Sequence, residues 1–338
     1  MSNIDWSSIG FGYMKTNKNI RATYKDGAWS DFVLTDEETV PIHMSASCLH
    51  YGTEIFEGLK AFRGVDGKVR IFRPDENGKR MAISADMLCM QSLPVDKFVE
   101  ACVEVVKANI EFVPPYESGA SLYLRPFILA SEAVLGVKPA KEFFFCIFVS
   151  PVGPYFKGGM TPIDVVIDVE SDRAAPRGTG RAKCGGNYAA SLLSGERAHD
   201  NGFSNVLFLD AVERKYIEEC GAANFFGIKN GTYITPVSPS ILHSITNMSL
   251  RTLASEEYGL KIEERPIAID ELPTFDECGA CGTAAVISPI GSVCDYRHEE
   301  KITYGTEPGK YCIMMYNKLQ DIQYGRCEDR YGWTVVVE

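Results

Sequence analysis

Three short turn signals constrain the fold of this chain more than any other feature. They are Asp26-Gly27, Asp66-Gly67 and Asn230-Gly231, and each lies between two runs rich in β-branched and aromatic residues. Asp-Gly and Asn-Gly pairs accept the positive φ angles that tight hairpin turns require. The chain is therefore expected to contain antiparallel sheet in both halves. The flanking runs are residues 19–24 and 29–33, 59–63 and 69–73, and 224–229 and 232–235.

Helical periodicity appears between these strand-like runs. Asp75 can cap a helix that runs to about Met90, and Pro94 precedes a second helix with one apolar face. We expect further helices at residues 187–198 and 247–258 and around 313–322, and further strands at 121–129, 142–149, 163–169, 206–209 and 216–219. Sheets covered by helices in this way define an α/β (α+β) fold.

The length of the chain predicts two domains. Its 338 residues exceed the roughly 250 to 300 at which a single hydrophobic core stops growing. Residues 151–159, PVGPYFKGG, interrupt all regular patterning. We expect a smaller N-terminal domain at 1–157, a linker at 158–170 and a larger C-terminal domain at 171–338, with the binding site in the cleft between the domains.

Charge and cysteine usage exclude several classes of function. The formal net charge of −11 disfavours nucleic acid as a partner. Among the eleven cysteines, Cys278 and Cys281 form one CxxC without a second pair to complete a zinc site, so no metal is expected. We expect free thiols in a reducing cytoplasm. The longest apolar run, residues 143–149, is too short to span a membrane, and no signal peptide is recognised.

Residues 178–191, GTGRAKCGGNYAAS, place one lysine, Lys183, among small residues. The glycines let a bulky group approach the backbone closely, and the helix expected at 187–198 would anchor the loop, with Leu192 and Leu193 available for burial. In a partly dry pocket, the ammonium of Lys183 loses its proton more readily and becomes the nucleophile that a Schiff base needs. A solvated lysine on a mobile surface loop is the alternative interpretation.

An imine-forming lysine commonly works with pyridoxal phosphate, which needs an acid for its ring nitrogen and a donor for its ring oxygen. Glu219, at the end of an expected strand, can keep the pyridine nitrogen protonated. Tyr188, five residues after Lys183, can donate to the ring oxygen. An ordinary solvated glutamate and a tyrosine that only packs are the alternatives.

The cofactor also needs a phosphate site. Ser244, Ile245 and Thr246 precede an expected helix, where free N–H groups favour an anion. The Gly282-Thr283-Ala284 turn is a second candidate, and Arg80 can add a charged bidentate contact. A plain helix cap and a plain hairpin turn are the alternatives for these segments.

Several segments in order make the chain resemble the branched-chain aminotransferases of pyridoxal-phosphate fold type IV over nearly its whole length. They are HYGTEIFEGLKAFRG at 50–64, VRIFRP at 69–74, LYLRPF at 122–127, PVGPYF at 151–156, KCGGNYAAS at 183–191 and GTAAVISPI at 282–290. The resemblance implies pyridoxal 5′-phosphate as the cofactor and a homodimer as the assembly. It also implies a reversible reaction of L-leucine, L-isoleucine or L-valine with 2-oxoglutarate, which gives the branched 2-oxo acid and L-glutamate.

The same resemblance implies a role for each site residue. Lys183 is the imine lysine, general base and catalytic residue, Glu219 the partner of the pyridine nitrogen and Tyr188 the ring-oxygen donor. The implied phosphate ligands are Arg80, Ile245, Thr246 and Thr283. The implied aromatic wall of the substrate site comprises Phe11, Tyr51, Phe56, Tyr123 and Tyr155, with Val137 lent by the neighbouring subunit. Thr283 and Ala284 would bind the substrate α-carboxylate, and Arg125 the carboxylate of glutamate.

Three departures from the family pattern stand out. Asn247 occupies a position where many relatives have arginine, which predicts a different phosphate contact. Ala285 and Ser288 replace the paired cysteines of the mammalian enzymes, so no redox switch of that kind is expected. The run ECGAANFF, which begins at Glu219, differs from the commoner EAG-type run.

Four other functions remain as alternatives. A D-amino-acid aminotransferase and an aminodeoxychorismate lyase share the fold, but the FEGLK run at 56–60 and the aromatic wall favour branched substrates. An NAD-dependent oxidoreductase would use the glycine loop near Lys183 for its cofactor, yet no helix starts within that loop. A pyridoxal-phosphate carrier without activity is the fourth.

Overall fold

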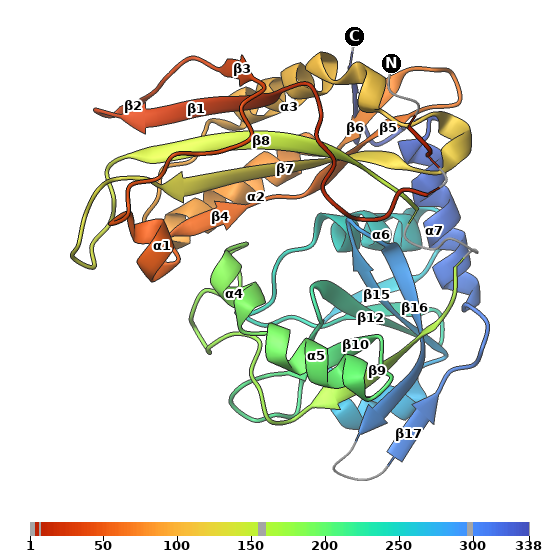
Figure 1. Ribbon diagram of the computed structural model, residues 1–338. Helices are drawn as coiled ribbons and strands as arrows, with labels where there is room; N and C mark the ends of the chain where they lie inside the picture. The colour runs from red at the N-terminus through yellow and green to blue at the C-terminus, as the bar shows by residue number, and fades with distance from the viewer. Residues whose placement is uncertain (1–3, 7, 155–159, 296–299, 338) are drawn as a thin grey trace. The chain divides into compact units, whose positions relative to one another are not determined.

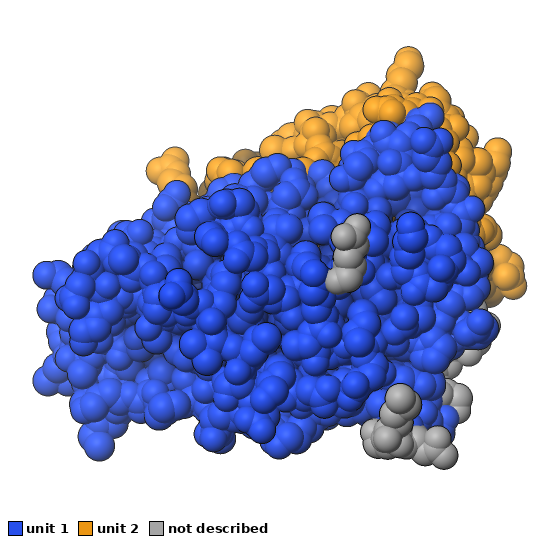
Figure 2. All heavy atoms as spheres, turned by 90° about the horizontal axis from the view of Figure 1, so that it is seen from above, with its two compact units in different colours: residues 1–155, 182–185, 321–338 blue, residues 156–181, 186–320 orange. Residues whose placement is uncertain are grey.

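The chain folds into two compact units, which Figure 2 colours separately. The computed structural model describes residues 4–6, 8–154, 160–295 and 300–337. Unit 1 comprises Met1–Tyr155, Ala182–Gly185 and Asp321–Glu338, and unit 2 comprises Phe156–Arg181 and Gly186–Gln320. The chain therefore returns to unit 1 twice, once with the lysine segment and once after residue 320, whereas the expected division placed everything after 171 in one domain.

Unit 1 is built on one antiparallel sheet (Figure 1). The strand order is β18-β6-β5-β7-β8-β1-β2, with β3 paired to β1 and β4 paired to β7. The strands are β1 (Asn19–Lys25), β2 (Ala28–Trp29), β3 (Val33–Thr35), β4 (Glu54–Phe56), β5 (Leu59–Arg63), β6 (Val69–Phe72), β7 (Ser121–Ala130), β8 (Phe143–Val152) and β18 (Thr334–Val337). Because β18 pairs with β6, the last described residues belong to the sheet of unit 1.

The hairpin turns of unit 1 form where the sequence predicts them. Lys25 pairs with Ala28 across Asp26-Gly27, whose φ angles of 52° and 88° are both positive. Arg63 pairs with Val69 around Asp66-Gly67. Both predictions are confirmed, because such turns depend on local backbone chemistry alone.

Two helices cover one face of the sheet of unit 1 (Figure 1). They are α2 (Pro74–Met87) and α3 (Val95–Ala108), and α3 buries Phe98, Ala101, Cys102, Val105 and Val106. These side chains belong to one buried cluster with core residues of β5, β7 and β8. Short elements complete the unit: α1 (Ser47–Tyr51) and the 3-10 turns η1 (Ile110–Phe112) and η2 (Tyr116–Ser118). This face of the sheet therefore holds the core of unit 1.

Unit 2 contains a mixed sheet that closes on itself. Strand β11 pairs with both β10 and β12, so β11, β10, β9, β16, β15 and β12 form a ring. The strands are β9 (Ile163–Asp168), β10 (Asn205–Leu209), β11 (Ile217–Cys220), β12 (Ala223–Lys229), β13 (Thr232–Thr235), β14 (Lys261–Glu264), β15 (Glu277–Gly282), β16 (Val286–Asp295) and β17 (Glu300–Thr303). The helical elements are α4 (Gly185–Ala189), α5 (Leu192–Asp200), α6 (Ile245–Glu256), η3 (Ile269–Thr274) and α7 (Lys310–Gln323), of which α4 begins and α7 ends in unit 1.

Three features of this region differ from the expectation. The linker expected at 158–170 begins outside the described residues, and the rest of it contains β9, which pairs in parallel with β10 and β16. The predicted helix at 187–198 is two helices, α4 and α5, separated by residues 190 and 191. Leu192 and Leu193 are exposed, because the break turns Ser194 and Ala198 inward instead.

Candidate active site

The segment that carries Lys183 is fixed by its backbone. The Lys183 amide donates to Ser84 Oγ at 2.9 Å, and its carbonyl oxygen accepts the Phe56 amide at 3.0 Å. The Gly185 amide donates to the carboxylate of Glu54. The residues on either side of Lys183 are buried in the core of unit 1. A mobile surface loop is therefore the wrong interpretation of this segment.

The Lys183 side chain lies at one end of a linked group of aromatic rings and one guanidinium. Its Nζ lies 4.5 Å from the centroid of the Phe56 ring. The Arg125 guanidinium lies 4.9 Å from the same centroid and 5.3 Å from that of Tyr123, and Nη2 of Arg125 donates to the Tyr123 hydroxyl at 3.3 Å. Phe11 meets Tyr123 edge to face at 5.2 Å. Five of the predicted site residues thus form one cluster on unit 1.

Lys60 is a second buried cation on this unit. It lies on β5 between two core residues of the helix-covered face, so its own side chain points to the opposite face, on which β7 places Tyr123 directly across. The residue is only 8% exposed, and burial lowers the pKa of its ammonium to about 8. The sequence offered one signal for it, a charge in the middle of an apolar strand.

The buried ammonium of Lys60 predicts a pH-dependent stability. The folded protein releases this proton near pH 8, whereas the unfolded chain holds it up to the ordinary pKa of about 10.5. Between these pH values the unfolded chain binds more protons, so the free energy of unfolding rises with pH by at most about 1.4 kcal/mol per unit. Urea unfolding of the wild type and of Lys60→Met across this range measures the difference, and parallel curves for the two proteins would contradict it.

Arg80 lies on α2 and binds a buried carboxylate. Its Nε and Nη2 donate to the two oxygens of Glu57 at 2.8 and 2.7 Å, and Asn77 donates to the same carboxylate at 2.7 Å. Glu57 is 0% exposed and Arg80 is 8% exposed. The ion pair therefore fixes the plane of the guanidinium, which is an orientation that the sequence did not predict.

Two predicted substrate-wall residues are associated with the loop between β7 and β8. The Tyr51 hydroxyl donates to the carbonyl oxygen of Leu135 at 2.6 Å, and Val137 is 82% exposed two residues further along this loop. Neither belongs to the five-residue cluster around Lys183 described above. Tyr155, a third predicted wall residue, lies outside the described residues.

In unit 2, Glu219 is buried on β11 and held by two groups. Its carboxylate accepts the Leu242 amide at 2.6 Å, and Nη2 of Arg173 lies 3.6 Å from the same oxygen. The strand register sets Glu219 opposite Asn224, and Asn224 opposite Cys281. Glu219 is thus an anchored buried carboxylate, and a solvated glutamate is the wrong interpretation.

The two predicted anion sites of unit 2 lie at the same end of the sheet as Glu219. Ile245 and Thr246 are the first residues of α6, and the N-cap Ser244 accepts the Asn247 amide at 3.2 Å. Thr283 and Ala284 form the turn between β15 and β16, two and three residues beyond Cys281. Tyr188, the predicted ring-oxygen donor, lies half-buried on α4.

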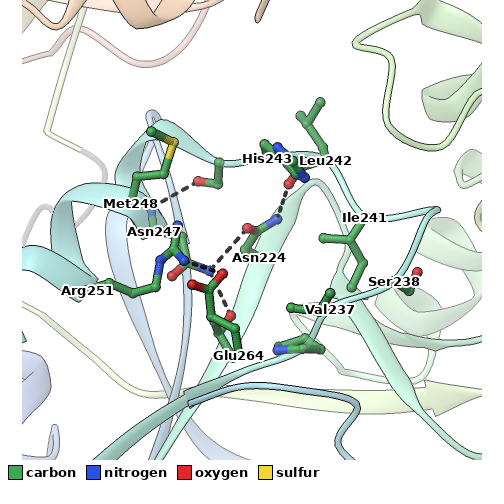
Figure 3. Close-up of a pocket in the computed structure, with 13 residues that line it drawn as sticks. Asn224, Val237, Ser238, Ile241, Leu242, His243, Asn247, Met248, Arg251 and Glu264 are labelled. Atoms are coloured by element: carbon green, nitrogen blue, oxygen red, sulfur yellow. Dashed lines mark hydrogen bonds and ion pairs between the residues drawn. The ribbon is translucent and has the colours of Figure 1, made fainter. Parts of the chain in front are cut away.

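Asn247 has a structural role. Its side chain accepts from the Tyr233 hydroxyl at 3.0 Å and donates to Asn224 and Thr235 at 3.2 and 2.8 Å. Figure 3 shows it among the residues that line a cavity of about 300 Å³, which borders Leu242 and the start of α6. These three hydrogen bonds hold the Asn247 side chain within the protein interior.

The CxxC cysteines are also structural. Cys278 and Cys281 are each 1% exposed, all eleven cysteines are free thiols, and burial raises the pKa of both CxxC thiols well above the ordinary value. No group of three or more metal-ligating side chains occurs among the described residues.

Every helix in the described part of the chain falls short of what a membrane span needs in length and hydrophobicity.

The residues of unit 2 fit the needs of pyridoxal phosphate. A buried anchored carboxylate can face a protonated ring nitrogen, and the N-terminus of the 12-residue helix α6 offers free amides for a phosphate. Sequence reasoning missed the residues that hold the site residues within each unit. In unit 2 these are Arg173 and Leu242, which hold Glu219. In unit 1 they are Ser84, which holds the Lys183 backbone, and Glu57, which holds Arg80. Glu57 lies in the FEGLK run at 56–60, whereas the other three stand in no local pattern that signals a function.

Comparison with known proteins gives consistent matches. The amino-transferase class IV family matches residues 54–293. The chain is 47% identical to a branched-chain-amino-acid aminotransferase of Haemophilus influenzae over 100% of both chains, and 48% identical to one of Helicobacter pylori over 100% of this chain and 99% of that one.

Solved structures agree with these matches. A branched-chain amino acid aminotransferase of Escherichia coli superposes with a TM-score of 0.80 at 28% identity, over 96% of this chain and 100% of that chain. The PLP form of one from Thermobaculum terrenum shares the fold, with a TM-score of 0.77 at 24% identity over 96% of this chain and 100% of that chain. The chain therefore belongs to the class IV aminotransferases and, within them, to the branched-chain-amino-acid aminotransferases.

Proposed function

We propose that this aminotransferase moves the amino group reversibly between L-leucine, L-isoleucine or L-valine and 2-oxoglutarate, with pyridoxal 5′-phosphate held by Lys183. The observation that carries the proposal is the fixed Lys183 segment, with Nζ 4.5 Å from the Phe56 ring, beside an aromatic surface. A lysine whose backbone is fixed beside a substrate surface presents its amine from a constant position, and the unprotonated amine is the nucleophile that an imine needs.

The cofactor supplies the electron sink that stabilises negative charge at the substrate Cα. In the proposal Lys183 is the residue that accepts and returns the proton of that carbon. Glu219 receives the hydrogen of the ring nitrogen, and Tyr188 donates to the ring oxygen. The proposed phosphate ligands are the guanidinium of Arg80, the amides of Ile245 and Thr246 and the hydroxyl of Thr283.

The aromatic surface of unit 1 is the proposed contact for the substrate side chain. The Arg125 guanidinium lies over both the Phe56 and Tyr123 rings, and Tyr123 meets Phe11 edge to face, so the rings and the guanidinium form one linked row. Rings reward apolar bulk but discriminate one methylene by only about 1 to 3 kcal/mol, so all three branched amino acids should react. Arg125 is the proposed partner of the second carboxylate of glutamate. Thr283 and Ala284 are the proposed partners of the substrate α-carboxylate. Tyr51, Tyr155 and Val137 complete the proposed wall.

Gly58 offers a direct test of this row. A Cβ at Gly58 would overlap the Tyr123 hydroxyl, so Gly58→Ala must displace the ring. We expect kcat/KM for L-leucine to fall by about tenfold or more, since misplacing a positioning group by about 1 Å can cost 10²-fold. Gly195→Ala is the matched control, because nothing lies within 4 Å of its added Cβ. Equal kinetics for both variants would remove Tyr123 from the wall.

A substrate panel tests the proposed reaction. L-leucine with 2-oxoglutarate should yield L-glutamate with ping-pong kinetics, and the purified protein should show a visible absorption band that an added amino acid shifts. Activity on D-alanine without activity on L-leucine would transfer the assignment to a D-amino-acid aminotransferase. Release of pyruvate from aminodeoxychorismate would indicate the lyase. A change in nicotinamide absorbance would indicate an oxidoreductase. The visible absorption band without any turnover would indicate a pyridoxal-phosphate carrier.

We also propose a homodimer in the cytoplasm. Val137 and Leu135, 82% and 84% exposed, are apolar side chains that a second copy of the chain can cover. Eleven free thiols fit a reducing compartment. Light scattering of the purified protein measures the mass, and a monomer at assay concentration would contradict the dimer.

A further inference from the structure

Arg173 is a deeply buried arginine of unit 2, at 6% exposed. Its Nη2 faces three oxygens. It donates to the carbonyl oxygens of Ser240 and Gly180, the latter at 3.4 Å, and lies 3.6 Å from the Glu219 carboxylate. One nitrogen of one side chain therefore joins two loops and a strand.

The two loops run against each other at this point. A Cβ at Gly180 would overlap the Ser240 carbonyl oxygen, so only glycine fits. Gly180 precedes Lys183 by three residues, and Ser240 precedes Leu242, whose amide binds Glu219, by two. Arg173 thus lies where the lysine-bearing loop, the approach to α6 and the buried carboxylate come together.

The charge of Arg173 matters because two adjacent carboxylates are buried beside it. Glu218 and Glu219 are each 3% exposed. Burial raises the pKa of the Glu218 carboxyl, and the charge of Arg173 and a 2.6 Å hydrogen bond from Ser238 oppose that rise. A buried carboxylate without a cation tends to take up a proton, and a neutral Glu219 would no longer offer a negative charge to a protonated ring nitrogen.

We propose that Arg173 is a positioning residue that keeps Glu219 ionised and correctly oriented for the cofactor ring, without touching the cofactor itself. The inference rests on the proposed function, because it takes Glu219 as the partner of the ring nitrogen. If Arg173 acts through Glu219, its effect on cofactor binding must disappear when Glu219 carries no charge. If it only ties loops together, its effect must persist.

A double-mutant cycle separates the two roles. The probe is pyridoxamine 5′-phosphate, which binds without a covalent bond to lysine, titrated calorimetrically into cofactor-stripped full-length protein. We expect Arg173→Gln to weaken binding by about tenfold in the wild-type background and by less than about twofold in a Glu219→Gln background. Arg173→Lys, which keeps the charge, should lie in between. Arg214→Gln is the matched control, since Arg214 pairs with the exposed Asp172 at 3.7 Å and should leave binding unchanged.

Each other outcome has a definite meaning. Equal losses in both backgrounds would overturn the inference and leave a loop-tying role. Unchanged binding in Arg173→Gln, with weakened binding in Glu219→Gln, would also overturn it while leaving the proposed function intact. Unchanged binding in Glu219→Gln would contradict the proposed role of Glu219 itself. Should Arg173→Gln fail to fold, Arg173→Lys carries the same cycle.

Discussion

Lys183→Ala should lower the rate of transamination by about 10⁴-fold or more, because it removes the proposed nucleophile and general base in one change. The backbone contacts of the segment use main-chain atoms of Lys183 and do not depend on its side chain. The variant should therefore fold normally and still bind pyridoxamine 5′-phosphate. Steady-state rates with L-leucine and 2-oxoglutarate measure the loss.

The control for this prediction is Lys97→Ala on α3, where the lysine side chain is 52% exposed and pairs with Glu100 at 2.8 Å. It should retain wild-type kinetics. Borohydride reduction followed by peptide mapping gives an independent check, since the label should appear on residue 183 of the wild type. Substantial turnover by Lys183→Ala, or a label elsewhere, would remove Lys183 from its role.

Arg80→Met should lower the free energy of unfolding by about 3 to 5 kcal/mol, because it leaves the fully buried Glu57 carboxylate without its cation. Urea unfolding without cofactor isolates this effect from the proposed phosphate contact of Arg80. Replacing both partners by methionine should recover most of the loss, since no uncompensated charge then remains.

Activity separates the two roles of Arg80. The double replacement should regain stability but bind pyridoxamine 5′-phosphate weakly, because the proposed phosphate ligand is still missing. Lys97→Met serves as the exposed control and should change unfolding little. Wild-type stability in Arg80→Met would show that the ion pair contributes nothing, and wild-type cofactor affinity in the double variant would exclude Arg80 as a ligand.

The parts of the fold that follow from neighbouring residues were predictable from the sequence. The hairpins at Asp26-Gly27 and Asn230-Gly231 depend on two residues each, and both form. Lys183 could be singled out because glycines surround it, and Ser244 as a helix cap because a helical pattern follows.

The contacts that join distant segments could not be predicted in the same way. The sequence around Arg173 does not indicate its ion pair with Glu219, and the sequence around Arg80 does not indicate its ion pair with Glu57. A charged residue alone does not show which distant residue it pairs with. The face that the last helix buries is a further example, because Ile313 is 40% exposed whereas its less bulky neighbour Cys312 is fully buried. Tertiary packing decided these cases.

The pairing of β6 with β18 affects how the protein is made. Residues 69–72 receive their partner only when residues 334–337 have been synthesised. During translation of everything in between, one margin of the N-terminal sheet offers unpaired amide and carbonyl groups to any other polypeptide. The nascent chain is therefore open to misassembly along β6 until β18 pairs with it.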